Sequence, residues 1–127
     1  MSPTVLPRTA PAPAPRGRIG AGFSPVPHRY HLYLYADCPR SARVAEALAR
    51  LGLRDSVAAT VLGADPDAPG HTALRRAYEA AGHPDAGPSD VPALCDTWSG
   101  RVVSNHTPDI LDDLRLLAAH PAFRTAR

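Results

Sequence analysis

The stretch after residue 28 restricts the possible folds of this chain more than any other feature, because strand-like and helix-like patterns alternate along it in one definite order. Runs of β-branched, aromatic and aliphatic residues predict strands, and apolar residues at helical spacing predict helices. We expect strands at 31–35, 56–62, 91–96 and 101–104, and helices at 40–51, 73–81 and 107–118. The order β-α-β-α-β-β-α has a parallel start and ends in an antiparallel hairpin. It predicts an α/β fold with a four-stranded mixed sheet and helices on both faces.

The last predicted helix has a clear start signal and one apolar face. Thr107 offers a hydroxyl cap, and Pro108 suits the first helical position. The apolar positions 110, 111, 114 and 117 would face the core. We therefore expect Asp112, Asp113 and Arg115 to point into solvent.

The beginning of the chain has a different character, with seven of the chain's 15 prolines in the first 27 residues. Proline cannot donate the backbone hydrogen bonds of helices and sheets, so this segment favours an extended, polyproline-like conformation. We expect a flexible arm at 1–28, one folded domain at 29–120 and a tail at 121–127. A length of 127 residues leaves no room for a second domain of ordinary size.

Charge and composition exclude several classes of function. The net charge of +2 is too small to indicate a nucleic-acid groove. No apolar run approaches the roughly 20 residues that cross a membrane, and the N-terminus has no signal-peptide pattern, so we expect a cytoplasmic protein without membrane contact. The two cysteines lie far apart and the six histidines show no paired spacing, so we expect neither a disulfide nor a metal site.

Cys38 is the strongest candidate for a catalytic residue, because it stands where the first strand passes into the first helix. The backbone N–H groups and the dipole of a helix N-terminus stabilise a thiolate over a thiol. Arg40 and Arg43 add positive charge nearby, while Asp37 opposes them. Ser41 stands where a dithiol oxidoreductase would place its second cysteine, which leaves monothiol chemistry with an outside thiol as the resolving group. The competing interpretation is a small buried residue at a helix start.

Two other residues have competing structural and functional interpretations. Cys95 lies within a predicted strand and is better explained as a small core residue than as a second nucleophile. Trp98 lies in the predicted hairpin turn, where it could contact a partner or fold back onto the sheet.

Several stretches together resemble the N-terminal, thioredoxin-like domain of the glutathionyl-hydroquinone reductases, which form the xi class of glutathione transferases and are relatives of the omega class. The matching stretches include Arg29-Tyr30-His31-Leu32-Tyr33, Cys38-Pro39, Leu74-Arg75 with Tyr78, Val91-Pro92-Ala93-Leu94-Cys95-Asp96, Ser99-Gly100 and Val103-Ser104-Asn105. They are spread over about ninety residues of the chain.

The resemblance implies a reaction and a set of site residues. In this family the cysteine before proline takes glutathione from a glutathionyl-hydroquinone, releases the hydroquinone and is left as a mixed disulfide that a second glutathione resolves. Cys38 would be that nucleophile, and a cis bond before Pro92 would let the backbone of Val91 hold the peptide part of the thiol. The bound thiol would be glutathione or another low-molecular-weight thiol. The resemblance implies that five further residues bind it: Pro39, Arg40, Asn105, His106 and Thr107.

The chain departs from the family pattern in three respects. Where the family has Cys-Pro-Trp-Ala-His-Arg, the present sequence reads Cys38-Pro39-Arg40-Ser41-Ala42-Arg43. The family's Glu-Ser, which holds the γ-glutamyl end of glutathione, is replaced by His106-Thr107, so the acceptor for the ammonium group of glutathione is missing. The composition, rich in Ala, Pro, Gly and Arg, is typical of a GC-rich bacterial genome, so mycothiol or another thiol is an alternative ligand. The family's all-helical second domain has no counterpart in these 127 residues.

Three functions remain open from the sequence. The first is a thiol-dependent transferase or reductase that acts on a conjugated or electrophilic small molecule, such as a quinone. The second is an enzyme recruited to specialised metabolism for a cyclisation, isomerisation or addition, and the third is a non-catalytic binding module. Because the helical domain closes the acceptor pocket in the family, we expect either a homodimer or a separately encoded helical partner.

Overall fold

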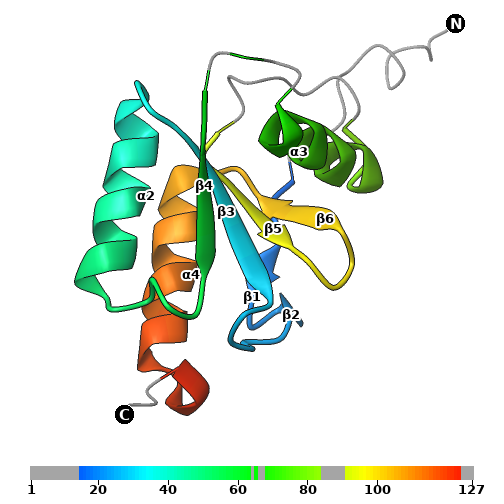
Figure 1. Ribbon diagram of the computed structural model, residues 1–127. Coiled ribbons are helices and arrows are strands. Elements are labelled where there is room, and N and C mark those ends of the chain that lie inside the picture. The colour runs from blue at the N-terminus through cyan, green and yellow to red at the C-terminus, as the bar shows by residue number, and fades with distance from the viewer. Residues whose placement is uncertain (1–14, 64, 66–67, 84–90, 124–127) are drawn as a thin grey trace, which may run out of the picture.

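The computed structural model describes residues 15–63, 65, 68–83 and 91–123, and within this part the chain forms the expected mixed sheet (Figure 1). The strands lie in the order β4 (Ala58–Leu62), β3 (Tyr30–Tyr35), β5 (Ala93–Asp96) and β6 (Arg101–Ser104). β3 pairs with β4 in parallel and with β5 antiparallel, and β5 pairs antiparallel with β6. The helices are α2 (Pro39–Arg50), α3 (Pro69–Ala80) and α4 (Thr107–Ala119), followed by the 3-10 turn η1 (Pro121–Phe123). The predicted order and sheet type are confirmed.

The helices cover both faces of the sheet, with α2 and α4 on one side and α3 on the other (Figure 1). The alternation of side chains along β3 explains this arrangement, since successive residues of a strand point to opposite faces. Leu32 and Leu34 join the core under α2 and α4. Tyr33 joins a second cluster with Leu74 and Tyr78 of α3. Two separate apolar cores therefore hold the sheet between its helices.

Three predicted elements begin two or more residues away from the observed start, and one of them is β5, which begins at Ala93 rather than at residue 91. α3 begins at Pro69 rather than at residue 73; its N-cap, Ala68, makes no side-chain hydrogen bond, and the start signal that the prediction missed is a proline at the first helical position. β4 begins at Ala58 rather than at residue 56, because the N–H groups of Ser56 and Val57 both donate to the carbonyl of Leu53 in the turn after α2.

The segment 15–28 corrects the expected arm, because it packs against the domain instead of extending freely from it. Arg18–Ile19 (β1) and Gly22–Phe23 (β2) form a small paired ribbon, and the Ile19 side chain is only 2% exposed. The N–H of Gly17 donates to the carbonyl of Val103 at 2.7 Å. A Cβ at Gly17 would meet that carbonyl oxygen at 2.8 Å, so glycine permits the close approach. Residues 1–14 of the expected arm and 124–127 of the expected tail lie outside the described residues.

The orientation of the acidic residues on α4 is a second correction. Asp112 and Arg115 point outward and pair with each other, as expected. Asp113, however, is completely buried. It faces Arg18 and the backbone of Ile19, and no pattern within α4 itself indicates these partners.

Candidate functional site

The sheet topology brings the predicted site residues to one edge. β3 and β6 run in the same direction, because each pairs antiparallel with β5 between them. Their carboxyl ends therefore lead to Cys38 and to Asn105 at the same edge of the sheet, where β5 also begins. The register that pairs Tyr33 with Ala93 sets Val91-Pro92 beside the end of β3. All three parts of the predicted thiol site thus gather at this edge.

Cys38 is the N-cap residue of α2 and is partly exposed. Its Sγ accepts a hydrogen bond from the N–H of Ser41 at 3.4 Å. Burial raises the pKa of the Cys38 thiol, but hydrogen bonds from Ser41 and Arg40 outweigh that effect and hold the pKa below the ordinary value. The thiol is therefore placed and polarised as a nucleophile would be.

Ser41 has a structural task that the sequence analysis did not assign to it. Its side chain is buried, and its Oγ accepts a hydrogen bond from the backbone N–H of Tyr35 at 3.0 Å. Ser41 thus links the last residue of β3 to the first turn of α2 and fixes the loop that carries Cys38. The sequence signal for a role of Ser41 was its position three residues after the N-cap Cys38, because the backbone N–H at that position donates to the N-cap side chain.

The peptide bond between Val91 and Pro92 is cis, as the sequence analysis predicted, and both residues are buried. Pro39 and Arg40 are exposed on the first turn of α2, next to Cys38. The edge thus presents a cysteine and a cationic side chain beside a buried proline turn.

The third part of the site is the turn from β6 into α4. The N–H of His106 donates to Ser104 Oγ at 3.1 Å, and Nδ1 of His106 lies 3.3 Å from Asp109 Oδ2. His106 is the N-cap position, so Thr107 is the first helical residue and the expected hydroxyl cap is wrong. Thr107 is buried, whereas Asn105 and His106 are partly exposed.

Of the other two candidates, Cys95 is a core residue and Trp98 is exposed. Cys95 is 4% exposed, and burial raises its pKa to about 12, which confirms its interpretation as a core residue. Trp98 is 66% exposed in the hairpin turn, with the guanidinium of Arg29 stacked 4.4 Å from its ring centroid. This turn lies at the opposite end of β5 from Val91-Pro92.

Within residues 15–63, 65, 68–83 and 91–123, no group of three or more His, Cys, Asp or Glu side chains could hold a metal ion. Cys38 and Cys95 are both free thiols. None of the helices in the described part of the chain is long and apolar enough to span a membrane.

We expect the alkylation rate of Cys38 to rise with an inflection below about 8.5, the pKa of a free thiol, because the Ser41 and Arg40 hydrogen bonds favour the thiolate. Iodoacetamide labelling followed by peptide mass spectrometry across pH 5 to 10 measures it. Cys95→Ser should leave the curve unchanged. If the fast labelling is found on Cys95 and is lost in Cys95→Ser, the assignment of Cys38 as the nucleophile is wrong.

The chain is similar to one curated enzyme and to several solved structures. It is 30% identical over 112 residues to the glutathionyl-hydroquinone reductase PcpF of Sphingobium chlorophenolicum. The alignment covers 76% of this chain and 36% of that enzyme. Its structure matches a xi-class glutathione transferase from Natrialba magadii with a TM-score of 0.64 at 24% identity, over 84% of this chain and 39% of that one. The glutathione-bound structure of YqjG, a glutathione transferase homologue from Escherichia coli K-12, matches with a TM-score of 0.60 at 24% identity, over 74% of this chain and 36% of that one. No protein-family model matches the chain.

These matches confirm the thioredoxin-like α/β fold and the resemblance seen in the sequence. The chain spans between a third and two-fifths of the length of the proteins that it matches.

Proposed function

We propose, from the similarity of this chain to the N-terminal part of xi-class glutathione transferases and glutathionyl-hydroquinone reductases, that it is a thiol-dependent reductase or transferase with Cys38 as its nucleophile. Its substrates are conjugates between a low-molecular-weight thiol and an electrophilic small molecule, such as a glutathionyl-hydroquinone. The observation that carries the proposal is the placement of Cys38 at the N-cap of α2, partly exposed, with its Sγ accepting a hydrogen bond from the N–H of Ser41.

The reaction takes two steps. The Cys38 thiolate attacks the sulfur of the conjugate, so that an S–S bond forms as the C–S bond breaks. The electron pair of the broken bond passes to the ring carbon, which takes a proton from water and leaves as hydroquinone. A second thiol then attacks the mixed disulfide, releases the oxidised thiol dimer and regenerates the Cys38 thiolate. The sulfur of the conjugate and the sulfur of the outside thiol each lose one electron, and the ring carbon gains the two.

The second step needs an outside thiol, because Ser41 stands where an internal resolving cysteine would lie. A pool of reduced thiol must therefore surround the protein, and a cytoplasmic location is part of the proposal.

Each of the three parts of this site would bind a different part of the thiol. The backbone of Val91, before the cis proline, would pair with the peptide part of the ligand. Asn105, His106 and Thr107 would meet its far end, where the first N–H groups of α4 favour a carboxylate. Arg40, which stands where the family pattern has tryptophan, would place a cation beside the sulfur.

Turnover of a defined conjugate tests the proposal. The purified chain, supplied with glutathionyl-hydroquinone and excess glutathione, should release hydroquinone and glutathione disulfide in equal amounts. Both products are measured by liquid chromatography against a protein-free control. A parallel reaction with the mycothiol conjugate and mycothiol identifies the preferred thiol, because His106-Thr107 replaces the family's Glu-Ser. Rates equal to the protein-free control with both thiols would overturn the proposal.

We expect the chain to self-associate, so that a second copy helps to close the acceptor side of the site. A dimer of ordinary size would bury on the order of 1,600 Å² in total. Exposed apolar side chains available for such contact include Val61 at 61% and Trp98 at 66% exposure. Light scattering at micromolar concentration measures the mass, and a monomer with full activity and no added partner would contradict this expectation.

A further inference from the structure

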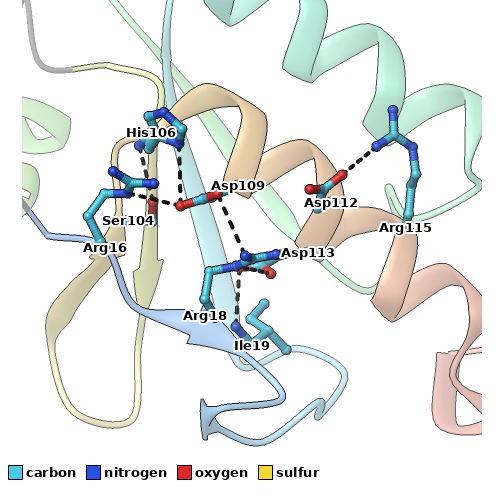
Figure 2. Close-up of polar contacts among 9 residues, drawn as sticks. All are labelled: Arg16, Arg18, Ile19, Ser104, His106, Asp109, Asp112, Asp113 and Arg115. Atoms are coloured by element: carbon cyan, nitrogen blue, oxygen red, sulfur yellow. Dashed lines mark hydrogen bonds and ion pairs between the residues drawn. The ribbon is translucent and has the colours of Figure 1, made fainter.

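The segment 15–19, which we call the N-terminal strap, lies across the β6 edge of the sheet and the first half of α4 (Figure 2). Arg16 forms an antiparallel bridge with Ser104, and the N–H of Gly17 donates to the carbonyl of Val103. The strap thus adds backbone pairing on the outer side of β6, immediately before the turn into α4.

Ion pairs anchor the strap to α4. Arg18 Nε lies 3.0 Å from Asp113 Oδ1, and the N–H of Ile19 donates to the other oxygen of the same carboxylate at 3.2 Å. Asp113 has no exposed surface, and Ile19 is 2% exposed in the core. A buried carboxylate with these partners fixes the strap firmly, because leaving it unpaired in the interior would be costly.

The Arg16 side chain brings the strap into contact with the first turn of α4. Its Nε lies 2.9 Å from Asp109 Oδ2, and Arg18 approaches the second oxygen of Asp109 at 3.6 Å. The same Oδ2 lies 3.3 Å from His106 Nδ1, a contact that becomes an ion pair when the imidazole is protonated (Figure 2). Asp109 therefore lies between the strap and His106, whose buried Nδ1 makes no other polar contact in the described residues.

Both ends of the turn depend on the strap. At one end, the backbone bridge of Arg16 fixes Ser104, whose Oγ accepts the hydrogen bond from the N–H of His106. At the other end, the carboxylate of Asp109 is oriented by two arginines and faces the imidazole of His106. Burial raises the pKa of Asp109, but Arg16, Arg18 and His106 together hold it below the ordinary value, so Asp109 stays charged.

We propose that Arg16 is a positioning residue of the thiol-binding site, which acts through Asp109 and Ser104 to fix His106 and the first turn of α4. This inference rests on the proposed function, because that function places the far end of the thiol at Asn105, His106 and Thr107. Arg16 itself need not touch the ligand. By restricting the conformations of the turn before the thiol binds, it lowers the conformational entropy that is lost on binding.

Steady-state kinetics with Arg16→Gln test the proposal. The KM for glutathione in the resolving step should rise about threefold to tenfold, which corresponds to the net free-energy contribution of one hydrogen bond. The alkylation rate of Cys38 should not change, because the hydrogen bonds and ion pairs described above join the strap to β6 and α4 and not to α2 or the β3–α2 loop. Arg16→Lys, which keeps the charge, should restore part of the loss.

Arg115→Gln is the matched control, because Arg115 pairs with Asp112 on the outer side of the same helix (Figure 2). It should leave the KM unchanged. An equal KM in Arg16→Gln and wild type, or an equal rise in both arginine variants, would overturn the proposal.

Amide chemical shifts separate failure of this inference from failure of the proposed function. In ligand-free protein, Arg16→Gln should shift the amide signals of Asn105, His106 and Thr107, and Arg115→Gln should not. If wild type turns over no conjugate but these shifts appear, the proposed function is wrong and the strap still fixes the turn. If they do not appear, the positioning role is wrong whatever the activity.

Discussion

Asp96→Asn should lower the free energy of unfolding by about 3–5 kcal/mol, the usual cost of removing one partner from a buried ion pair. Asp96 has no exposed surface. Its carboxylate accepts hydrogen bonds from Arg29 Nε at 2.7 Å and Nη2 at 3.0 Å, and from Ser99 Oγ at 2.7 Å. The substitution would leave the Arg29 guanidinium without its counter-charge, so the start of β3 and the β5–β6 hairpin would lose their common anchor.

Urea unfolding followed by circular dichroism measures this loss. Asp112→Asn is the matched control, because it removes a carboxylate from the exposed pair with Arg115 and should cost about 0–1 kcal/mol. Equal losses of unfolding free energy in the two variants would show that the buried pair with Arg29 stabilises the fold no more than the exposed pair does.

The same pair predicts a dependence of stability on pH. Burial raises the pKa of Asp96, but hydrogen bonds from Arg29, Ser99 and the N–H of Trp98 outweigh it and lower the pKa. A carboxyl with a lowered pKa in the folded state stabilises the fold above its unfolded pKa and loses that contribution as pH falls through the folded value. The wild-type advantage over Asp96→Asn should therefore shrink in strongly acidic solution.

Cys38→Ser should reduce turnover of glutathionyl-hydroquinone to the protein-free rate. A serine hydroxyl at this position can still accept the hydrogen bond from the N–H of Ser41, so the cap of α2 is retained. It cannot form the S–S bond on which the proposed first step depends. The expected loss is therefore in the chemical step rather than in folding.

Cys95→Ser provides the comparison for this variant. Cys95 is buried between the sheet and α3, so its replacement should reduce stability modestly and leave the turnover per folded molecule unchanged. Substantial turnover by Cys38→Ser, at a matched fraction of folded protein, would remove Cys38 from the mechanism.

The local patterns of the sequence were sufficient to predict the main fold. The run of β-prone residues at 31–35 and the helical spacing of Val44 and Leu48 correspond to β3 and α2, and the hairpin turn lies at 97–100, between the two strands predicted to flank it. The prediction that Cys38 lies at a helix start also depended only on neighbouring residues, because Pro39 marks the first helical position.

The partners of the buried charges could not be predicted in the same way. Asp113 follows the buried Ile110 by three residues and precedes Leu117 by four, so it borders the apolar face of α4. Whether such a position is buried depends on Arg18, which lies 95 residues earlier in the chain. The proline content of the first 27 residues favoured an extended segment, but an extended segment can also pair with a sheet edge, as Arg16 and Gly17 do.

The central claim is that Cys38 takes the thiol from a conjugate, and intact-protein mass spectrometry tests it most directly. The chain is mixed with glutathionyl-hydroquinone in the absence of free glutathione, quenched with acid and then digested to locate the modification. We predict that one glutathionyl group is added at Cys38 as hydroquinone appears, and that dithiothreitol removes it. An unmodified Cys38, or a glutathionyl group at Cys95 alone, would contradict the account.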